Sequence, residues 1–362
     1  MATQSRDITS EFNNPWQSSS RVREPVELLK PAIDPAGWYP EDFAERDSWM
    51  YCLSAPEIAE LHEAVAAVEA RGLDLKDVGK DDFPLPILGV ALADIADEIM
   101  MGRGFALIRG LPVEGRSRYQ IAAAFWGIGA HMGEARSQNT QGHLLGHVKD
   151  IGGSYATGRG YMSRDALLFH SDRADILSLG CLQTAKSGGD HRICSSVTIY
   201  NEMLKRRPDL LEELTWRFYR IRKGEIPPGQ PQRDWVREPI FSVEQGFLTA
   251  RGPSAPVFKA QSMPDVPKLT EAQKKAITMF SDLAKEVSMG IDYEPGDISF
   301  VMNHVTQHAR TDYEDWPEPD RKRHLLRLWL RTGRRPLQED VAQALAGVED
   351  ENTVFQTPLD AE

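Results

Sequence analysis

Short apolar runs separated by turn residues fill two stretches of this chain and constrain its fold more than any other feature. The first stretch, at about 166–200, contains ALLF, ILSLGCL and RICSS, which predict consecutive antiparallel strands. The second stretch follows the Pro-Gly-Asp turn at 295–297 and ends with HLLRLWLR at 324–331. A helical insertion lies between them, without the regular alternation of strand and helix that a parallel sheet shows. We therefore expect a mainly β fold class, a double-stranded β-helix (jelly roll) core decorated with α-helices.

Two of the expected helices carry clear end signals. The first begins at Ser54, which forms a capping-box pattern with Glu57, and it ends at Gly72. The second spans 270–290 and opens with a capping-box pattern of its own. A further helix is expected within the insertion, at about 197–206.

Length and composition favour one large domain. The chain has 362 residues, of which 41% are hydrophobic, so it can bury a sizeable core. We expect a flexible N-terminal arm at 1–30, then a single domain at 31–335. Within that domain, 31–100 is expected to be helical and about 101–335 to form the jelly-roll core. An acidic tail at 336–362 follows, at most a surface helix with a frayed end.

Charge and cysteine usage exclude several classes of partner. The chain carries 42 Lys and Arg against 54 Asp and Glu, a formal net charge of −12, so no nucleic-acid partner is expected. No segment approaches the roughly 18 apolar residues of a membrane helix, so no membrane partner is expected. Cys52, Cys181 and Cys194 are odd in number and lack a metal-binding spacing, which fits a reducing cytoplasm. Homo-oligomer formation stays open.

Three residues form a candidate metal site. His170 and Asp172 stand where a strand is expected to run into a turn, and His308 is expected just after another strand. Residues two apart on a regular strand point to the same face, so His170 and Asp172 can bind one ion. Two imidazoles and one carboxylate are the facial triad that leaves half of an iron(II) octahedron open. The HxD pattern alone is weak, because it occurs by chance in many chains.

The last expected strand adds a candidate anion site. Arginines 323, 327 and 331 fall on one face by period two, and aliphatic residues fill most of the other. We expect Arg331 to face solvent among the many acids. For Arg323 and Arg327 we favour a place at the barrel mouth, because a guanidinium holds a carboxylate in a bidentate fork. Such a fork suits the distal carboxylate of 2-oxoglutarate.

Taken together, these residues resemble the taurine dioxygenase (TauD/TfdA) family of iron(II)- and 2-oxoglutarate-dependent oxygenases, which has the clavaminate synthase-like fold. The likeness covers roughly Gly104 to Arg331. It runs, in the order that family members show, through GFALIRGLP, FHSD, LGCLQTAKSGGD, the GD at 296–297, NHVTQH and the closing RKRHLLRLWL. This joint pattern is far more specific than HxD.

The resemblance implies roles for single residues. His170, Asp172 and His308 are the implied catalytic ligands of Fe(II). Arg323 is the implied anchor of the co-substrate 2-oxoglutarate, with Arg327 near the substrate or near the same carboxylate. The segment after His308 looks longer than in taurine dioxygenase, so the two arginines can exchange these roles.

The resemblance also implies a reaction. Dioxygen and 2-oxoglutarate are consumed, succinate and CO2 are released, and a C–H bond of a small-molecule substrate is oxidised. Hydroxylation is the default outcome, while desaturation and ring formation stay open. Arg327 hints at an anionic substrate group such as a carboxylate.

Two departures from the taurine enzyme concern the ligands. Where that enzyme has a threonine that helps to anchor 2-oxoglutarate, this chain has His191, which can donate the same hydrogen bond or face solvent. Where it has an asparagine that touches substrate, this chain has Ala166, which argues against taurine as the substrate.

The remaining histidines are expected to have structural roles. We interpret His304 as a core residue or a neighbour of the metal ligands, and His131, His143 and His147 as loop residues. The last two stand in a segment, SQNTQGHLLGH, that can contribute to the substrate pocket.

Two other functions are compatible with the same scaffold. Two histidines and a carboxylate also bind catalytic zinc in hydrolases. A hydrolytic reaction would, however, give Arg323 and Arg327 no role. A non-catalytic ligand-binding protein is the second alternative, and an intact triad weighs against it.

Overall fold

The computed structural model describes residue 16 and residues 22–43, 46–152 and 162–361. The predicted N-terminal arm therefore lies largely outside the described residues. Within its last part, Val26 is buried and its N–H donates to the carbonyl of Gly246 at 2.9 Å. Arg23 forms an ion pair with Asp34 at 2.9 Å. These contacts fix residues 22–34 against the domain.

A seven-stranded sheet forms the larger half of the core, and we call it the major sheet. Its strands occur in the order β1 (Met50–Cys52), β2 (Phe105–Arg109), β14 (Ile298–Met302), β6 (Ile176–Gln183), β17 (His324–Arg331) and β3 (Glu134–Ala135), and β4 (Leu145–Val148) also pairs with β17. All pairings are antiparallel except that of β1 with β2.

A four-stranded minor sheet faces the major sheet. Its order is β13 (Ser288–Ile291), β8 (His191–Ser195), β15 (Thr306–Arg310) and β5 (Leu167–His170). Apolar side chains from both sheets, among them Phe105 and Ile193, meet in a core between them. The two facing sheets, built from non-consecutive strands, form the jelly roll that the sequence predicted.

The predicted pairing of consecutive strands at 166–200 is wrong. Strand β5 pairs with β15, β6 pairs with β14 and β17, and β8 pairs with β13 and β15. The three strands themselves exist close to their predicted positions. Their partners differ because the chain passes from one sheet to the other between them, which a pattern of local turns does not reveal.

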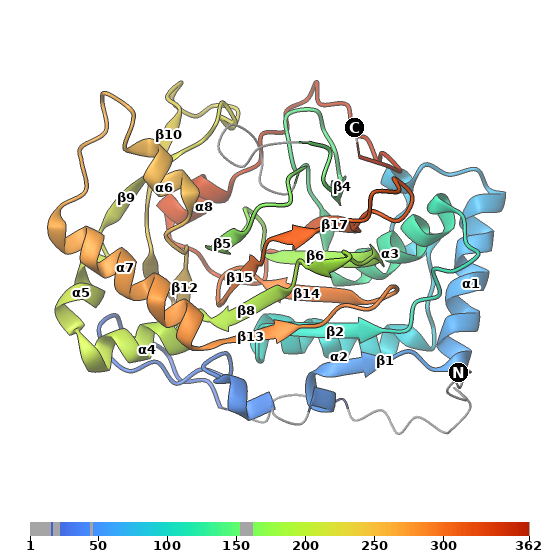
Figure 1. Cartoon of the computed structure of the whole chain (residues 1–362), viewed down its shortest axis with the longest axis horizontal. Coiled ribbons are helices and arrows are strands. Elements are labelled where there is room, and N and C mark those ends of the chain that lie inside the picture. The colour runs from blue at the N-terminus through green and yellow to red at the C-terminus, as the bar shows by residue number, and fades with distance from the viewer. Residues whose placement is uncertain (1–15, 17–21, 44–45, 153–161, 362) are drawn as a thin grey trace.

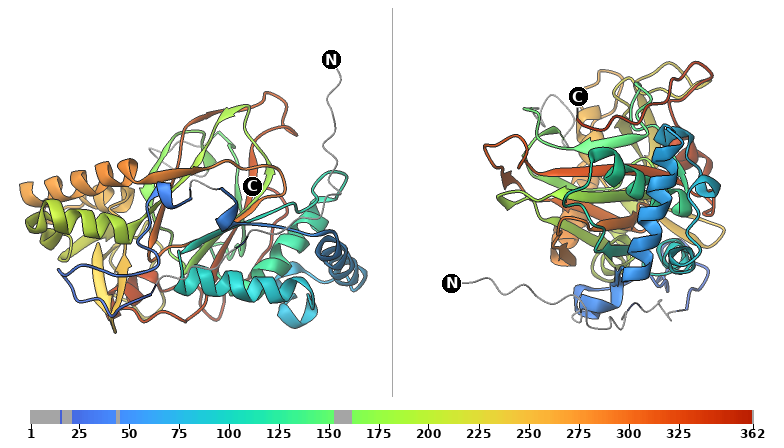
Figure 2. Two further views of the ribbon diagram at one scale, coloured as in Figure 1. Left: turned by 90° about the horizontal axis from the view of Figure 1, so that it is seen from below. Right: turned by 90° about the vertical axis from the view of Figure 1, so that its right-hand side faces the viewer.

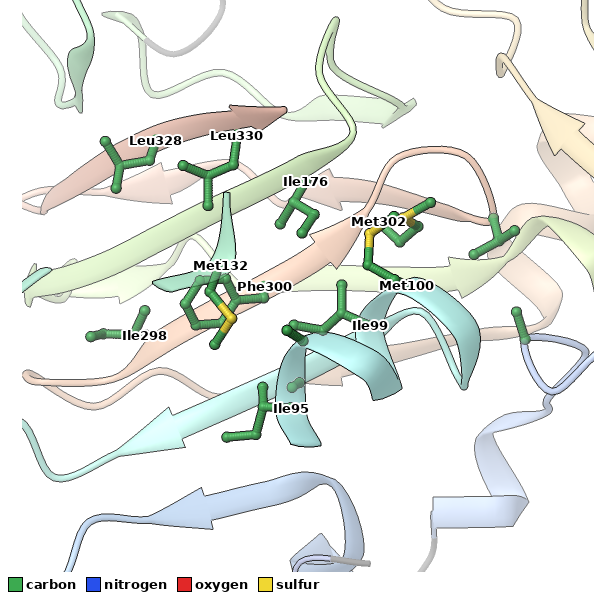
Figure 3. Close-up of a cluster of buried hydrophobic side chains, with 14 of the residues drawn as sticks. Ile95, Ile99, Met100, Met132, Ile176, Ile298, Phe300, Met302, Leu328 and Leu330 are labelled. Carbon is green, nitrogen blue, oxygen red and sulfur yellow. The ribbon is translucent and has the colours of Figure 1, made fainter. Parts of the chain in front are cut away.

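Three helices lie on the outer side of the major sheet: α1 (Ala55–Ala70) packs on α3 (Arg118–Met132), and α2 (Leu88–Met101) and α3 pack on the sheet itself. The first confirms the predicted helix, since the backbone N–H of Ser54 donates to Glu57 at 2.7 Å and Gly72 follows its end with φ of 63°. Figure 3 shows side chains of α2 and α3 packed on isoleucine, leucine, methionine and phenylalanine of β6, β14 and β17. Each such buried side chain contributes about 1.5–3 kcal/mol, so this layer stabilises the sheet that carries the arginine strand.

The helical insertion gathers at one end of the molecule, opposite α1 (Figure 1). It contains α4 (Ser196–Arg206), α5 (Pro208–Glu213), α6 (Ala255–Ala260), α7 (Glu271–Glu286) and the hairpin-like pairs β9 (Arg217–Ile221) with β10 (Trp235–Pro239) and β11 (Phe241–Glu244) with β12 (Phe247–Ala250). Helix α7 ends four residues before the predicted Gly290, because Ser288–Ile291 joins the minor sheet as β13. A short pair of β7 (Ser187–Gly188) with β16 (Tyr313–Glu314) completes the strands.

The C-terminal segment docks on the domain. Helix α8 (Glu339–Leu345) buries Val341 and Leu345. Farther along, the N–H of Leu144 donates to the carbonyl of Gln356 at 2.8 Å, and the N–H of Gln356 donates to Gly142 at 2.9 Å. The predicted frayed end is therefore not observed in 339–361. In the described part of the chain, no helix has the length and apolar character needed to cross a membrane.

Candidate functional site

The three predicted metal ligands come together between the two sheets. His170 is the last residue of β5, Asp172 follows two residues later, and His308 lies within β15, directly opposite His170 in the register. The prediction that His308 follows a strand is thus corrected: the short turn at 303–305 returns the chain into a new strand before it. One ligand atom from each residue lies within 4.8 Å of the others.

The donor geometry of this site fits a single metal ion. His170 Nε2 is 3.8 Å from Asp172 Oδ1, and His308 Nε2 is 4.0 Å from Asp172 Oδ2. Ligands about 2.1 Å from one ion and at right angles to each other are about 3 Å apart, so a small contraction completes the site. The Nδ1–H of His170 donates to the carbonyl of Leu168 at 2.8 Å, which leaves its Nε2 free for a metal.

The electrostatics of the site also suit metal binding. Burial, together with the charges of the nearby imidazoles and Arg327, lowers the pKa of His308 well below its usual range. A neutral imidazole offers the lone pair that a metal needs. His308 and His170 rings lie 4.1 Å apart between centroids.

Several side chains hold Asp172 in place. The Trp329 indole N–H donates to Asp172 Oδ2 at 2.8 Å, which leaves Oδ1 toward His170. The Asn303 side chain accepts from the N–H of Asp172 at 2.9 Å. Arg251 donates to the Asp172 carbonyl at 2.8 Å. The carboxylate is therefore fixed from the major sheet, and the backbone of Asp172 is fixed from the turn before β15 and from the insertion.

His304 supports this loop from the core. It is fully buried, and its Nε2 lies 2.8 Å from Asp175 Oδ1. The other oxygen of Asp175 accepts from the N–H of Thr332 at 2.7 Å and from the N–H of Gly333 at 3.3 Å. This arrangement ties the segment after Asp172 to the end of β17, which agrees with a core role for His304.

A second group of polar side chains lies beside His308. Arg323 is 3% exposed, and its Nη2 donates to the carbonyl of Gly189 at 3.3 Å. His191 is also 3% exposed, so the solvent-facing alternative for this residue is wrong. Its ring stacks on His308 with 5.8 Å between centroids. Burial, then the charges of Arg323, His170 and Arg310, lowers the pKa of His191 to about 3, so its imidazole is neutral.

Arg327 faces a different space from Arg323. Its Nε donates to Gln138 Oε1 at 2.6 Å, and its guanidinium lies 5.1 Å from the centroid of the Trp329 ring. Arg327 lines a cavity of about 390 Å³ whose walls are polar and apolar in similar measure. Those walls come from the 138–151 segment, Met162 and the C-terminal residues Pro358, Asp360 and Ala361. The predicted Arg331 is exposed, as expected.

Two of the supposed loop histidines lie in regular elements instead. His131 belongs to α3 and His147 to β4, and His143 alone of the three stays in a loop, where it lines the cavity. Sequence patterns placed no strand at 145–148, because four residues next to a glycine-rich stretch carry little periodicity.

His147, His324 and Asp360 form a second cluster of metal-ligating side chains, yet its hydrogen bonds account for the histidines. His147 Nε2 donates to the carbonyl of Pro358 at 2.8 Å, so its Nδ1 accepts from His324 Nε2 at 2.7 Å. His324 Nδ1 in turn accepts from Arg118 at 3.2 Å. Each neutral histidine thus donates one hydrogen bond and accepts another. Together they form a hydrogen-bonded series that ends at the carbonyl of Pro358 in the C-terminal segment.

This histidine chain predicts a pH-dependent stability. Burial lowers the pKa of His324 to about 3 and lowers that of His147, whereas both titrate near 6.5 when unfolded. Below pH 6.5 the unfolded chain therefore binds more protons than the folded chain does. The free energy of unfolding decreases as the pH falls below this value. For His324 alone the loss is about 2 kcal/mol at pH 5. Urea unfolding at pH 7 and pH 5 tests this value, and a His324→Gln variant should show a smaller pH dependence. An equal dependence in both proteins would contradict it.

Sequence reasoning missed Trp329, Asn303 and Arg251 as parts of the site, whereas Gln138 lies in the segment SQNTQGHLLGH that was expected to contribute to the pocket. The sequence did contain a pattern that could have identified Trp329, because the alternation of the last strand places it on the same face as Arg323 and Arg327. No sequence pattern could have identified Arg251, since it lies in the insertion and reaches the backbone of Asp172 only through the tertiary fold.

Comparison with known proteins agrees with this geometry. Residues 69–329 match the family model described as taurine catabolism dioxygenase TauD, TfdA family. The chain is 32% identical over 319 residues to FR-33289 synthase of Streptomyces rubellomurinus, which covers 84% of this chain and 92% of that protein. It is 29% identical over 315 residues to the taurine hydroxylase-like protein SAT17 of Stachybotrys chartarum, covering 84% and 80%.

The solved structures show the same fold. Asparagine oxygenase in complex with Fe(II), 3-hydroxyasparagine and succinate matches with a TM-score of 0.60 at 18% identity, covering 78% of this chain and 94% of that one. The fold, the converging triad and the extent of the sequence match lead to one assignment. The chain belongs to the TauD/TfdA family and is a non-haem Fe(II)- and 2-oxoglutarate-dependent dioxygenase.

Proposed function

We propose that His170, Asp172 and His308 hold the Fe(II) of this dioxygenase. The observation that carries the proposal is the convergence of three ligand atoms within 4.8 Å from two strands and a loop. When bound, the iron supplies the oxidising chemistry of the family. The protein's own residues position the ligands, the co-substrate and the substrate around a site in which His308 is buried and His170 and Asp172 are half-buried.

We further propose that Arg323 and His191 bind the distal carboxylate of 2-oxoglutarate. Arg323 Nη1 and His191 Nε2 are buried and have no hydrogen-bond partner among the described residues, so both are available to a ligand. The stacking of His191 on His308 places this pair beside the metal ligands. Arg327 is the less suitable anchor, because its guanidinium already bonds Gln138 and lines the separate cavity.

The substrate we propose is a small molecule with a carboxylate or similar anionic group that binds Arg327. Support comes from the cavity of about 390 Å³, in which Lys149 pairs with Asp360 at 2.9 Å and Arg327 is the other cationic side chain. Its size suits a compact polar molecule rather than a polymer. Three free cysteines support a reducing, cytoplasmic location.

The activity test uses the purified full-length chain. With Fe(II), dioxygen and 2-oxoglutarate, succinate formation is expected even without a prime substrate, at a low rate. A set of small acids is then screened by thermal shift under anaerobic Fe(II) and 2-oxoglutarate, and the acid that stabilises the protein should raise the rate. Zinc-dependent hydrolysis without dioxygen, or binding of 2-oxoglutarate without turnover, would contradict the proposal.

Trp329→Phe is expected to weaken Fe(II) binding by about 10- to 100-fold, the usual cost of removing a group that orients a metal ligand. Phenylalanine keeps most of the ring but cannot donate to Asp172 Oδ2. Anaerobic titration with Fe(II) measures the affinity. Trp235→Phe is the matched control, because this tryptophan also donates its indole N–H to a carboxylate, Asp265 at 2.6 Å, at an exposed place in the insertion. Unchanged iron affinity in Trp329→Phe would show that the indole does not position the carboxylate.

A further inference from the structure

A buried arginine next to the metal ligands has no established task. Arg310 lies on β15 two residues after His308 and is 5% exposed. Its Nη2 donates to the backbone carbonyl of Ser163 at 2.8 Å and also to that of Asp165. Its Nε and Nη1 are buried, and within the described part of the chain neither has an acceptor. Two of its three nitrogens are therefore available to a ligand.

Arg310 belongs to a group of four neighbouring side chains, each with a buried hydrogen-bonding group that has no partner among the described residues. The Tyr313 ring lies between two guanidinium groups, 4.9 Å from that of Arg310 and 5.3 Å from that of Arg323. His191 is directly opposite Arg310 in the antiparallel register, so both side chains occupy one face. The Tyr313 hydroxyl, Arg323 Nη1 and His191 Nε2 also lack partners among the described residues. We call these four residues the donor cluster.

The donor cluster requires an anion. Buried hydrogen-bond donors are costly when unpaired, and two cations packed on one ring repel each other. Asp315 is a carboxylate nearby: its Oδ1 accepts from the backbone N–H groups of Arg323 and Trp316, and its Oδ2, although buried, accepts from none of the four donors. A carboxylate ligand offers about four lone-pair sites, enough for donors from several of these side chains.

The position of the cluster identifies the anion. Residues two apart on a strand lie on the same face and about 6.6 Å apart, so this is the spacing of His308 and Arg310. It is roughly the length of a five-carbon dicarboxylate. A 2-oxo acid whose first two carbons lie at the metal ligands would extend its far carboxylate toward Arg310 and Arg323. A 2-oxo acid without a second carboxylate would leave the donors unpaired.

We propose that Arg310, supported by Tyr313, is a second guanidinium for the distal carboxylate of 2-oxoglutarate and sets the preference for a dicarboxylic co-substrate. The inference rests on the proposed function and deepens it. A carboxylate held by Arg323 alone would be fixed from one side. With Arg310 it is held from both sheets, because Arg323 immediately precedes β17 and Arg310 belongs to β15.

The test compares two ligands of equal chain length. Anaerobic calorimetry with Fe(II)-loaded full-length protein measures Kd for 2-oxoglutarate and for 2-oxopentanoate, which lacks the distal carboxylate. Arg310→Met is expected to raise Kd for 2-oxoglutarate by about 10- to 100-fold and to leave that for 2-oxopentanoate nearly unchanged. The matched control is Arg192→Met, because Arg192 faces the other side of the same sheet and donates to Ser288.

A merely structural role gives a different result. If Arg310 only holds the carbonyls of Ser163 and Asp165, its loss weakens both 2-oxo acids equally, which overturns the inference. Tyr313→Phe covers the case in which Arg310→Met does not fold: it removes one hydroxyl and should weaken 2-oxoglutarate alone, by about 3- to 10-fold. An equal effect on both acids, or none, overturns the inference too. Failure of the wild type to bind 2-oxoglutarate would instead overturn the proposed function itself.

Discussion

Replacing His308 with alanine is expected to abolish both Fe(II) binding and the formation of succinate from 2-oxoglutarate. The remaining His170 and Asp172 stand on one short segment, whereas His308 closes the site from the neighbouring strand β15. Two ligands cannot define a face of an octahedron, so the ion loses its fixed position as well as one bond. Anaerobic iron titration and an oxygen-dependent succinate assay measure the two losses.

The control for this prediction is His62→Ala. His62 lies on α1, where its Nδ1 is 3.4 Å from Arg116 at the surface, so its loss should leave iron binding and turnover unchanged. Circular dichroism and thermal melting check that His308→Ala is folded. Retained iron-dependent turnover in a folded His308→Ala protein would show that the metal is held elsewhere.

Arg323→Met is expected to weaken 2-oxoglutarate binding by about 3 kcal/mol, roughly a factor of 10² in Kd. The Arg323 side chain is 3% exposed, and methionine fills the same space. The substitution leaves the distal carboxylate of 2-oxoglutarate without its main cationic partner at a position that water hardly reaches. Iron affinity should change little, because Arg323 touches none of the three metal ligands in the structure. Calorimetry under anaerobic conditions measures both quantities.

Arg331→Met is the matched control, since Arg331 ends β17, the strand that Arg323 immediately precedes, but is exposed and pairs loosely with Glu134 at 3.7 Å. If Arg323→Met bound 2-oxoglutarate as tightly as Arg331→Met, the anchor would have to be assigned to Arg327. An Arg327→Met variant, assayed in the same way, then decides between the two arginines.

The local parts of this fold could be predicted from sequence because short-range rules determine them. The capping box at Ser54 placed the start of α1, and the alternation after Arg323 placed β17 with its two faces. The candidate triad was also accessible, because the residue types themselves restrict the chemistry.

The pairing of strands and the outer supports of the site could not be predicted in the same way. Whether β5 joins β6 or β15 depends on which sheet buries each apolar face, a property of the whole chain. Arg251 and Asn303 reach Asp172 through contacts across 79 and 131 residues of sequence. Such contacts leave no periodic trace. Helix α7 ended early for a related reason, since pairing with β8 overrode helix propensity at Ser288.

The docked C-terminal segment has a consequence for how such enzymes diversify. The family match ends at residue 329, yet Pro358 and Asp360, well past that limit, form part of the cavity wall that Arg327 lines. The stretch after residue 329 therefore supplies one part of that wall, while the residues around 138–151 supply most of the rest from within the matched stretch. If the cavity holds the substrate as proposed, replacing residues 339–361 with those of a relative is expected to change substrate preference while Fe(II) and 2-oxoglutarate binding stay the same.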